Sequence, residues 1–267
     1  MAPLRLFYRH PLWIRVTHWL NAICMAVLLM SGLQIFNAHP ALYWGQKSDF
    51  DHPIFSISSV EDAQGNESGV TTVAGHSFNT TGVLGLSRGG DRAFPDWATL
   101  PHEQWLAIGR RWHFFFAWIF VINGLIYVAT SLIGRHLRGD LVPTRADLVH
   151  IGRSIWEHVR LRFPKGDEAK RYNVLQKLAY LIVVFVLGPV MVLAGLTMSP
   201  RLDASYPILL EIFGGRQSAR TIHFICAFSF LGFFVIHIVM VLLSGVFNNL
   251  RSMITGWYNL GENREHA

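Results

Sequence analysis

Hydrophobic residues are concentrated in four long runs, and polar segments separate these runs. The runs cover about residues 13–36, 108–133, 175–198 and 221–247. Each is near or above the roughly 20 residues that a helix needs to cross a bilayer core about 30 Å thick. The alternation that is typical of strands is absent from them. The pattern therefore predicts an all-α fold, an integral membrane four-helix bundle.

The first run needs a separate argument, because an apolar stretch near an N-terminus can be a cleaved signal peptide. This run is long for a signal-peptide core, carries Arg15 and His18, and is not followed by a clean small-x-small cleavage site. We therefore expect it to remain in the protein as a helix.

Basic residues predict the orientation of the bundle. Residues 134–174 contain nine Lys or Arg, whereas the longer segment 37–107 contains three, together with eight acidic residues. Cytoplasmic loops of membrane proteins are enriched in Lys and Arg. We therefore expect the N and C termini and the 134–174 segment in the cytoplasm, and 37–107 as an external loop.

The two long polar segments differ in character. Residues 37–107 are rich in Gly, Ser, Thr, Asn and aromatic residues. A loop of this length is uncommon unless it is functional or covered by a partner, so we expect short strands or turns over a docking surface. In the cytoplasmic segment, apolar residues recur at helical spacing from Thr144 to about Phe163 and predict an amphipathic connector helix. This helix could rest on lipid headgroups or lie in solvent.

Composition supports the membrane interpretation. Charged residues make up 15% of the chain, against about 25% in soluble domains. The net charge of +6 follows membrane topology, and a basic module with interleaved aromatic residues is absent, so we expect no nucleic-acid partner. Cys24 and Cys226 lie in different apolar runs and indicate small core residues rather than a disulfide. A C-x-x-C-H motif is absent, which excludes covalent attachment of a c-type haem.

Four histidines lie inside the apolar runs, and these are His18, His113, His223 and His237. An ionisable residue inside a membrane span is expensive and indicates a functional site. His223 and His237 share one run and are fourteen residues apart. That spacing is nearly four helical turns, so both side chains leave one face, about 21 Å apart along the axis. The spacing predicts two sites at two depths of the bilayer.

Depth predicts which histidines meet. His18 and His237 lie toward the cytoplasmic side of their runs, and His113 and His223 lie toward the external side. Two imidazoles that ligate a haem iron from both sides leave no open position for a substrate, and such a centre suits electron transfer. The sequence therefore predicts two bis-histidine haems, one for each pair.

Other interpretations of the four histidines fit their placement less well. A lone histidine in a membrane helix is often a hydrogen-bonded packing residue, but four such residues would make both the depth match and the spacing coincidences. Copper or non-haem iron could also use histidines, but would need three or more ligands close together. The four histidines divide between two depths instead.

Neighbouring residues could complete haem pockets. Four glycines in the runs could let a macrocycle approach a helix, or serve helix packing, and these are Gly32, Gly124, Gly195 and Gly232. Four arginines near the ends of the runs could pair with haem propionates or extend toward the interface, and these are Arg15, Arg110, Arg111 and Arg220. Both alternatives stay open in each case.

Three stretches carry a resemblance to a known family. They are "RVTHW", "GRRWHFFFAWIFVINGLIY" and "HFICAFSFLGFFVIH", and they contain the four histidines. The chain resembles the bacterial cytochrome b561 and nickel-iron hydrogenase-type b cytochrome superfamily, which includes the membrane subunits of formate dehydrogenases and thiosulfate reductases. The resemblance covers the four runs, most of the chain.

The resemblance implies a single cytochrome b membrane domain, spanning residues 1–267, in the bacterial inner membrane. It implies two haem b groups that exchange electrons with quinone and with an external oxidoreductase. His113 and His223 would ligate the external haem, and His18 and His237 the cytoplasmic one. The long "FNTTGVLGL…FPDWATLP" loop departs from the hydrogenase and formate dehydrogenase members. It looks like the subgroup whose partner is a molybdopterin oxidoreductase of the sulfite-oxidase type.

Two other classes of function are compatible with the sequence. One is a self-contained membrane quinone oxidoreductase, and the other is a haem-free membrane anchor. An acid–base or nucleophile grouping typical of a catalytic site is not evident in the chain, so the first interpretation remains an electron-transfer subunit.

Overall fold

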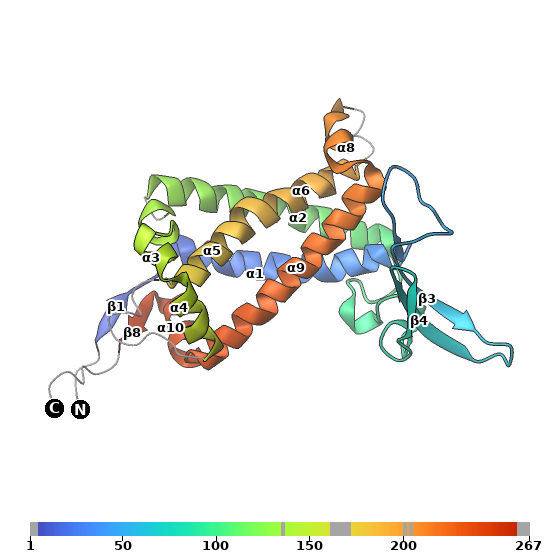
Figure 1. The fold of residues 1–267 in the computed structure, drawn as a ribbon, viewed down its shortest axis with the longest axis horizontal. Coiled ribbons are helices and arrows are strands. Elements are labelled where there is room, and N and C mark those ends of the chain that lie inside the picture. Colours follow the sequence, from blue (N-terminus) through green and yellow to red (C-terminus); the bar gives the residue numbers. More distant parts are fainter. Residues whose placement is uncertain (1–4, 135–136, 161–171, 200–201, 203–204, 261–267) are drawn as a thin grey trace. The chain divides into compact units, whose positions relative to one another are not determined.

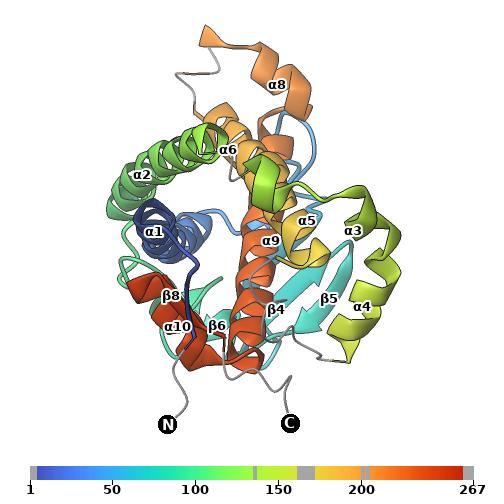
Figure 2. The ribbon, with the colours of Figure 1, turned by 90° about the vertical axis from the view of Figure 1, so that its left-hand side faces the viewer.

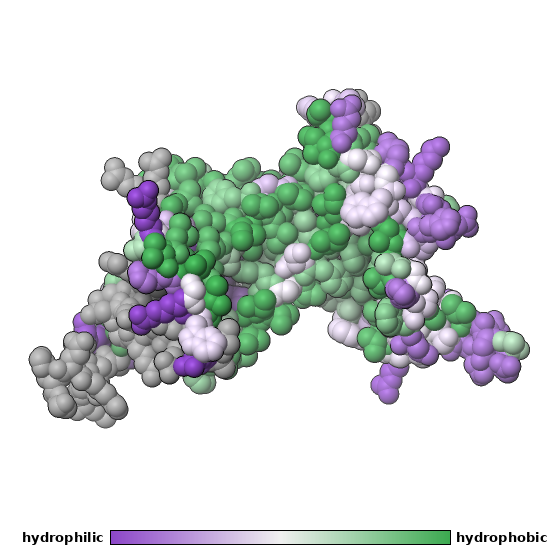
Figure 3. Space-filling model, viewed as in Figure 1, coloured by the Kyte–Doolittle hydropathy of each residue, from purple (hydrophilic) through white to green (hydrophobic). Residues whose placement is uncertain are grey.

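The computed structural model describes residues 5–134, 137–160, 172–199, 202 and 205–260. Four of its helical segments are long and apolar enough to cross a membrane. They are α1 (Leu12–Phe36), α2 (Leu106–Ile133), the combined span Val174–Thr197 and α9 (Arg216–Leu243). Only 6–22% of the most apolar window in each segment is buried within the protein. Hydrophobic side chains cover the outside of these helices (Figure 3), as expected of surfaces that face lipid. The protein is an integral membrane protein with a helical bundle.

Three spans begin and end within two residues of the predicted bounds, whereas the fourth does not. The apolar run of about 221–247 is offset from the helix that contains most of it, because α9 covers Arg216–Leu243. Gly215, with φ of 114°, precedes the helix, and its Cβ would lie 2.5 Å from the carbonyl oxygen of Gly45. At the other end Gly245, with φ of 106°, separates α9 from α10 (Val246–Thr255). Both positions require the left-handed conformation that glycine adopts readily.

The third span contains an irregular turn. It consists of α5 (Val174–Ile182), the π-helical segment η4 (Val183–Leu187) and α6 (Gly188–Thr197). Pro189 has no N–H to donate and its ring collides with the carbonyl four residues earlier. The wider π turn directly before Gly188-Pro189 accommodates that missing bond.

The chain forms two compact units, which are described separately. The terminal unit comprises residues 1–20, 122–189 and 228–267, as far as they are described, and the sheet unit comprises residues 21–121 and 190–227. The helices α1, α2 and α9 and the third span each contribute residues to both units.

In the terminal unit the two ends of the chain are paired. Strand β1 (Leu6–Tyr8) forms an antiparallel ladder with β8 (Trp257–Asn259) (Figure 1), and Figure 2 shows β8 beside α10. Trp19 of α1 donates its indole N–H to the carbonyl of Met253 at 3.1 Å. The guanidinium of Arg9 lies 4.8 Å from the centre of the Tyr258 ring. The start of α1 is therefore held by the C-terminal segment.

The connector segment of the terminal unit differs from its prediction. One helix from Thr144 to Phe163 is expected, but the structure has α3 (Arg145–Val149) and α4 (Ile151–Val159). His150 lies between the two helices, and its Nδ1 is 2.8 Å from the carbonyl oxygen of Ala146. Phe163 itself lies outside the described residues. Just before these helices, η2 (Leu137–Leu141) forms a short π-helical segment.

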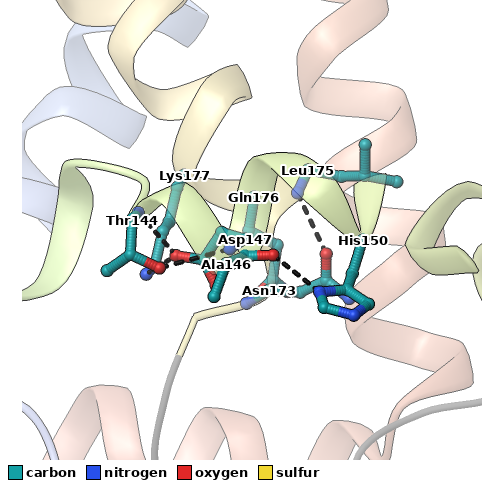
Figure 4. Close-up of polar contacts among 8 residues, drawn as sticks. All are labelled: Thr144, Ala146, Asp147, His150, Asn173, Leu175, Gln176 and Lys177. Atoms are coloured by element: carbon teal, nitrogen blue, oxygen red, sulfur yellow. Dashed lines mark hydrogen bonds and ion pairs between the residues drawn. The ribbon is translucent and has the colours of Figure 1, made fainter. Parts of the chain in front are cut away.

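A polar cluster ties α3 to the start of the third span (Figure 4). Thr144 and Asp147 cap α3 reciprocally. The buried Lys177 of α5 donates to Asp147 Oδ2 at 2.9 Å. The Lys177 hydrogen bond, aided by the Thr144 backbone N–H, lowers the pKa of Asp147 to about 2. The Asp147 carboxylate therefore stays ionised, and paired with Lys177, at neutral pH.

The sheet unit carries the strands of the long loop. An antiparallel sheet has the order β2-β3-β4-β5, and β6 pairs separately with β7. Figure 1 labels the central strands β3 and β4. The bounds are β2 Ala41–Leu42, β3 Phe55–Glu61, β4 Glu67–Val73, β5 His76–Asn79, β6 Gly85–Ser87 and β7 Gly90–Arg92. The 3₁₀ turn η1 (Asp96–Ala98) and the short helix α8 (Ile208–Phe213) complete the unit. The composition of the loop predicts such short strands, and the structure adds them to an otherwise helical fold.

An aromatic core fixes this sheet to helix ends of the same unit. Phe36, at the end of α1, packs with Phe94 and with Phe224 of α9, at ring-centre distances of 5.7 and 4.8 Å. Phe55 of β3 lies 5.4 Å from the Phe224 ring. Phe224 directly follows His223, so the core of the sheet adjoins one of the candidate histidines. Cys24 and Cys226 are buried and free in this unit, in agreement with their predicted packing role.

Candidate haem-binding site

His113 of α2 and His223 of α9 face each other within the sheet unit. Their ring centres lie 6.2 Å apart, with 66° between the ring planes. Imidazole nitrogens bind metals at about 2.0–2.1 Å, as known for zinc. With about 1.15 Å from each ring centre to its nitrogen, two imidazoles that share one metal have their centres roughly 6.3 Å apart. The observed separation therefore fits an ion held between the two rings.

The other nitrogen of each ring in this pair is already engaged. His223 Nδ1 lies 2.9 Å from the carbonyl oxygen of Met191, which can only accept, so Nδ1 carries the hydrogen. His113 Nδ1 lies 3.1 Å from Ser31 Oγ. Ser31 donates its own hydrogen to the Val27 carbonyl at 2.6 Å, so its oxygen accepts from the imidazole. Both rings are left with Nε2 as the free lone pair, and such an outer partner is typical of metal-binding histidines.

Two glycines lie against the His113 and His223 rings, where a side chain would occupy space next to each imidazole. A Cβ on Gly32 would lie 3.4 Å from His113 Cε1, and a Cβ on Gly195 would lie 3.1 Å from His223 Cε1. Both glycines were expected near a macrocycle or at a helix contact, and the structure places them against the imidazoles. A Cβ at position 195 would therefore require the His223 ring to move by a few tenths of an ångström, whereas a Cβ at position 32 would make an ordinary contact with the His113 ring.

His18 of α1 and His237 of α9 form a second pair, within the terminal unit. Their ring centres are also 6.2 Å apart, with 56° between the planes. Aromatic side chains hold these rings: Trp19 meets His18 edge-on, and Phe233 stacks on His237 with centres 6.0 Å apart. His18 Nδ1 is buried and has no hydrogen-bond partner in the described part of the chain. Gly124 and Gly232 have open space where a Cβ would stand.

Each histidine pair offers two protein ligands, which fits a metal whose remaining ligands belong to a cofactor. Within the described ranges, no three His, Cys, Asp or Glu side chains gather as a metal cluster. A zinc or copper ion usually requires three or four protein ligands. A haem iron requires only the two axial ligands from the protein, because the macrocycle supplies the other four.

The four candidate arginines are placed differently. Arg110 and Arg111 are exposed on α2. Arg15 is half-buried and donates to the carbonyl of Ile254, while its Nε is buried without a partner among the described residues. Arg220 is half-buried as well and donates to the carbonyl of His39. Burial therefore favours Arg15 and Arg220 over the other two as partners of a buried anion.

Several residues at these sites were not predicted from the sequence. Ser31, the Met191 carbonyl and Phe233 contact the histidines, and His39 lies beside Arg220. A hydroxyl directly before Gly32 in an apolar run was a usable signal for Ser31. A backbone carbonyl such as that of Met191 has no signal in the sequence.

Comparison with known proteins defines the class. The sequence profile of the prokaryotic cytochrome b561 family matches residues 9–256, so the chain belongs to that family. It is therefore a membrane haem-binding electron-transfer protein of a family that binds haem b. A protein of Azospira oryzae named "Putative protein-methionine-sulfoxide reductase subunit YedZ1" is 28% identical over 252 residues, covering 92% of this chain and 96% of that protein. No solved structure matches the chain.

Proposed function

We propose that this protein is a di-haem b subunit that carries electrons across the inner membrane between quinone and an external oxidoreductase. His113 and His223 ligate one haem, and His18 and His237 ligate the other. The observation that carries the proposal is the pair of imidazole couples, each with ring centres 6.2 Å apart.

The residues of the chain set the properties of each centre. Bound haem supplies reversible one-electron chemistry. Ser31 and Met191 fix the tautomer of His113 and His223, so that Nε2 is the ligating atom. Trp19 and Phe233 restrict the His18 and His237 rings by packing. The pairs lie on apolar helices, and such low-dielectric surroundings would tune the potential of a haem held there.

We infer the sidedness from charge. Nine basic residues in 134–174 against three in 37–107 favour cytoplasmic termini. The sheet unit, and with it the His113–His223 pair, then belongs to the external side. The quinone would exchange electrons with the cytoplasmic pair, and the external pair would serve the partner.

The partner is inferred from the relative. The Azospira oryzae protein is named as a putative subunit of a protein-methionine-sulfoxide reductase. We propose that this chain serves an oxidoreductase of that kind, with a molybdopterin centre in the soluble partner. The long external loop, with its net acidic charge, is the surface on which that partner would dock.

Haem quantification tests the proposal. Protein purified in detergent is expected to show the reduced-minus-oxidised spectrum of low-spin haem b, with two haems per chain. A His76→Ala variant is the control, because His76 is exposed on β5. One haem per chain, or a high-spin spectrum, would contradict the assignment of two bis-histidine centres.

A further inference from the structure

Arg220 is a cation without a carboxylate partner in the described part of the chain. It lies on α9 three residues before His223 and is half-buried. Its Nη2 donates to the carbonyl of His39, and its guanidinium lies 5.5 Å from the centre of the Phe36 ring. No described residue offers it a carboxylate. Partial burial of a guanidinium is costly unless an anion and hydrogen bonds compensate it, so a half-buried Arg220 with no described carboxylate beside it is a candidate to bind an anionic ligand.

His39 supplies a second unsatisfied group at the same place. Its Nε2 is buried and has no hydrogen-bond partner in the parts of the chain that are described. Tyr43 and Phe50 enclose the ring, with centres 5.6 and 5.7 Å away. Burial and the adjacent Arg220 lower the pKa of His39, so the imidazole is neutral at pH 7. A neutral imidazole with its hydrogen on Nε2 can donate one hydrogen bond to an anion.

We propose that Arg220 and His39 form a carboxylate-binding site, occupied by a propionate of the haem that His113 and His223 ligate. This inference rests on the proposed function. The guanidinium offers paired N–H groups that match a carboxylate, and His39 adds a third donor. Residues three apart on a helix are neighbours on its surface, so Arg220 and His223 can contact one tethered ligand.

The test measures the midpoint potential of each haem by spectroscopic redox titration, together with the haem content. Arg220→Gln is expected to keep the His18–His237 centre unchanged. It should lower the potential of the other centre, because an unneutralised carboxylate stabilises the ferric state. Haem retention at that centre should fall roughly tenfold or more, the usual loss when a supporting partner is removed.

Two further variants separate this role from a role in folding. Arg220→Lys keeps the charge and should restore most of the potential. His39→Phe leaves the Arg220 side chain in place and should lower the potential less than Arg220→Gln does. The proposed site would be wrong if Arg220→Gln, Arg220→Lys and His39→Phe all fold, retain two haems and keep wild-type potentials.

Matched controls come from the same unit. Arg216 also lies on α9 and also donates to a backbone carbonyl, that of Met198 at 2.8 Å, but it is exposed. His52 is an exposed histidine that contacts Asp49. Arg216→Gln and His52→Phe should leave both potentials unchanged. An equal shift in Arg216→Gln would show a general surface-charge effect and overturn the proposal.

The source of the carboxylate is tested by titrating wild-type protein with acetate at constant ionic strength. A tethered propionate predicts no change of potential, whereas a shift would mean that the site takes a free carboxylate. The outcomes also separate the two proposals. Wild-type protein without haem would end the proposed function, whereas two haems with potentials insensitive to Arg220 would end only this inference.

Discussion

The two histidine pairs have the same spacing but are supported in different ways. In the sheet unit, both rings are fixed by hydrogen bonds at Nδ1 and by close packing on glycine. In the terminal unit, stacked aromatic rings hold the pair, and His18 Nδ1 has no partner among the described residues. Hydrogen bonds fix both the rotation and the tautomer of an imidazole, whereas stacking leaves the tautomer open. The His113–His223 site is therefore the more preorganised of the two.

The strongest test of this comparison removes one ligand at a time. His223→Ala and His113→Ala are each expected to reduce the haem content from two to one and to leave identical spectra. His237→Ala and His18→Ala should each remove the haem of the His18–His237 pair and leave the haem of the His113–His223 pair. The measurement is haem per chain with the absorbance maximum of the remaining centre. Four variants that did not sort into these two classes would show that the pairing is wrong.

A smaller effect is expected from glycine substitution. Gly195→Ala puts a Cβ 3.1 Å from His223 Cε1, so the ring must shift, and haem affinity at that pair should fall about tenfold. Gly232→Ala is the matched control, because nothing lies within 4 Å of its added Cβ. Haem loss during extended dialysis is the measurement. Equal haem loss in the Gly232→Ala variant would mean that both pairs depend on glycine alike.

Removal of one hydrogen bond sharpens the comparison further. Ser31→Ala removes the hydroxyl oxygen that accepts from His113 Nδ1, while the Leu28 backbone carbonyl remains as a hydrogen-bond partner of that ring, so haem retention at that pair should weaken by up to about tenfold. Thr17→Val is its counterpart beside His18, since the Thr17 hydroxyl donates only to carbonyls of its own helix. We expect Thr17→Val to retain both haems. A larger loss in Thr17→Val than in Ser31→Ala would reverse the ranking of the two sites.

The smallest expected effect concerns the fold of the terminal unit. Asp147→Asn removes the ion pair with Lys177 and should lower the free energy of unfolding by about 1 kcal/mol at pH 7. Because folding lowers the Asp147 pKa to about 2, from about 3.9 when unfolded, the pair stabilises the protein above pH 4. That contribution is lost as the pH falls toward 2.

Thermal unfolding in detergent measures this effect of the Asp147 pair. Asp49→Asn is the control, because both Asp49 and its partner His52 are largely exposed to solvent, and it should change little. An Asp147→Asn protein as stable as the wild type would show that the capping of α3 does not depend on the carboxylate charge.

Hydrophobic runs and histidine spacing predicted most of the bundle and both ring pairs. Three spans and the meeting of His113 with His223, and of His18 with His237, follow from period and depth alone. The ends of α9 were missed, because positive φ at Gly215 and Gly245, rather than apolarity, sets them. The contacts of Ser31 and Met191 depend on the rotation of α1 and α6 about their axes, which a weakly amphipathic sequence does not specify. The break at His150 divides a segment whose helical periodicity continues across it.

The ladder between β1 and β8 joins residues some 250 positions apart in the chain. During synthesis, Leu6–Tyr8 is therefore made first, and its partner strand Trp257–Asn259 is made only after the four apolar spans. The ladder can therefore close only after residues 257–259, which follow α9 and α10, have been synthesised. These two short strands thus hold together the parts of the terminal unit that are made earliest and latest in synthesis.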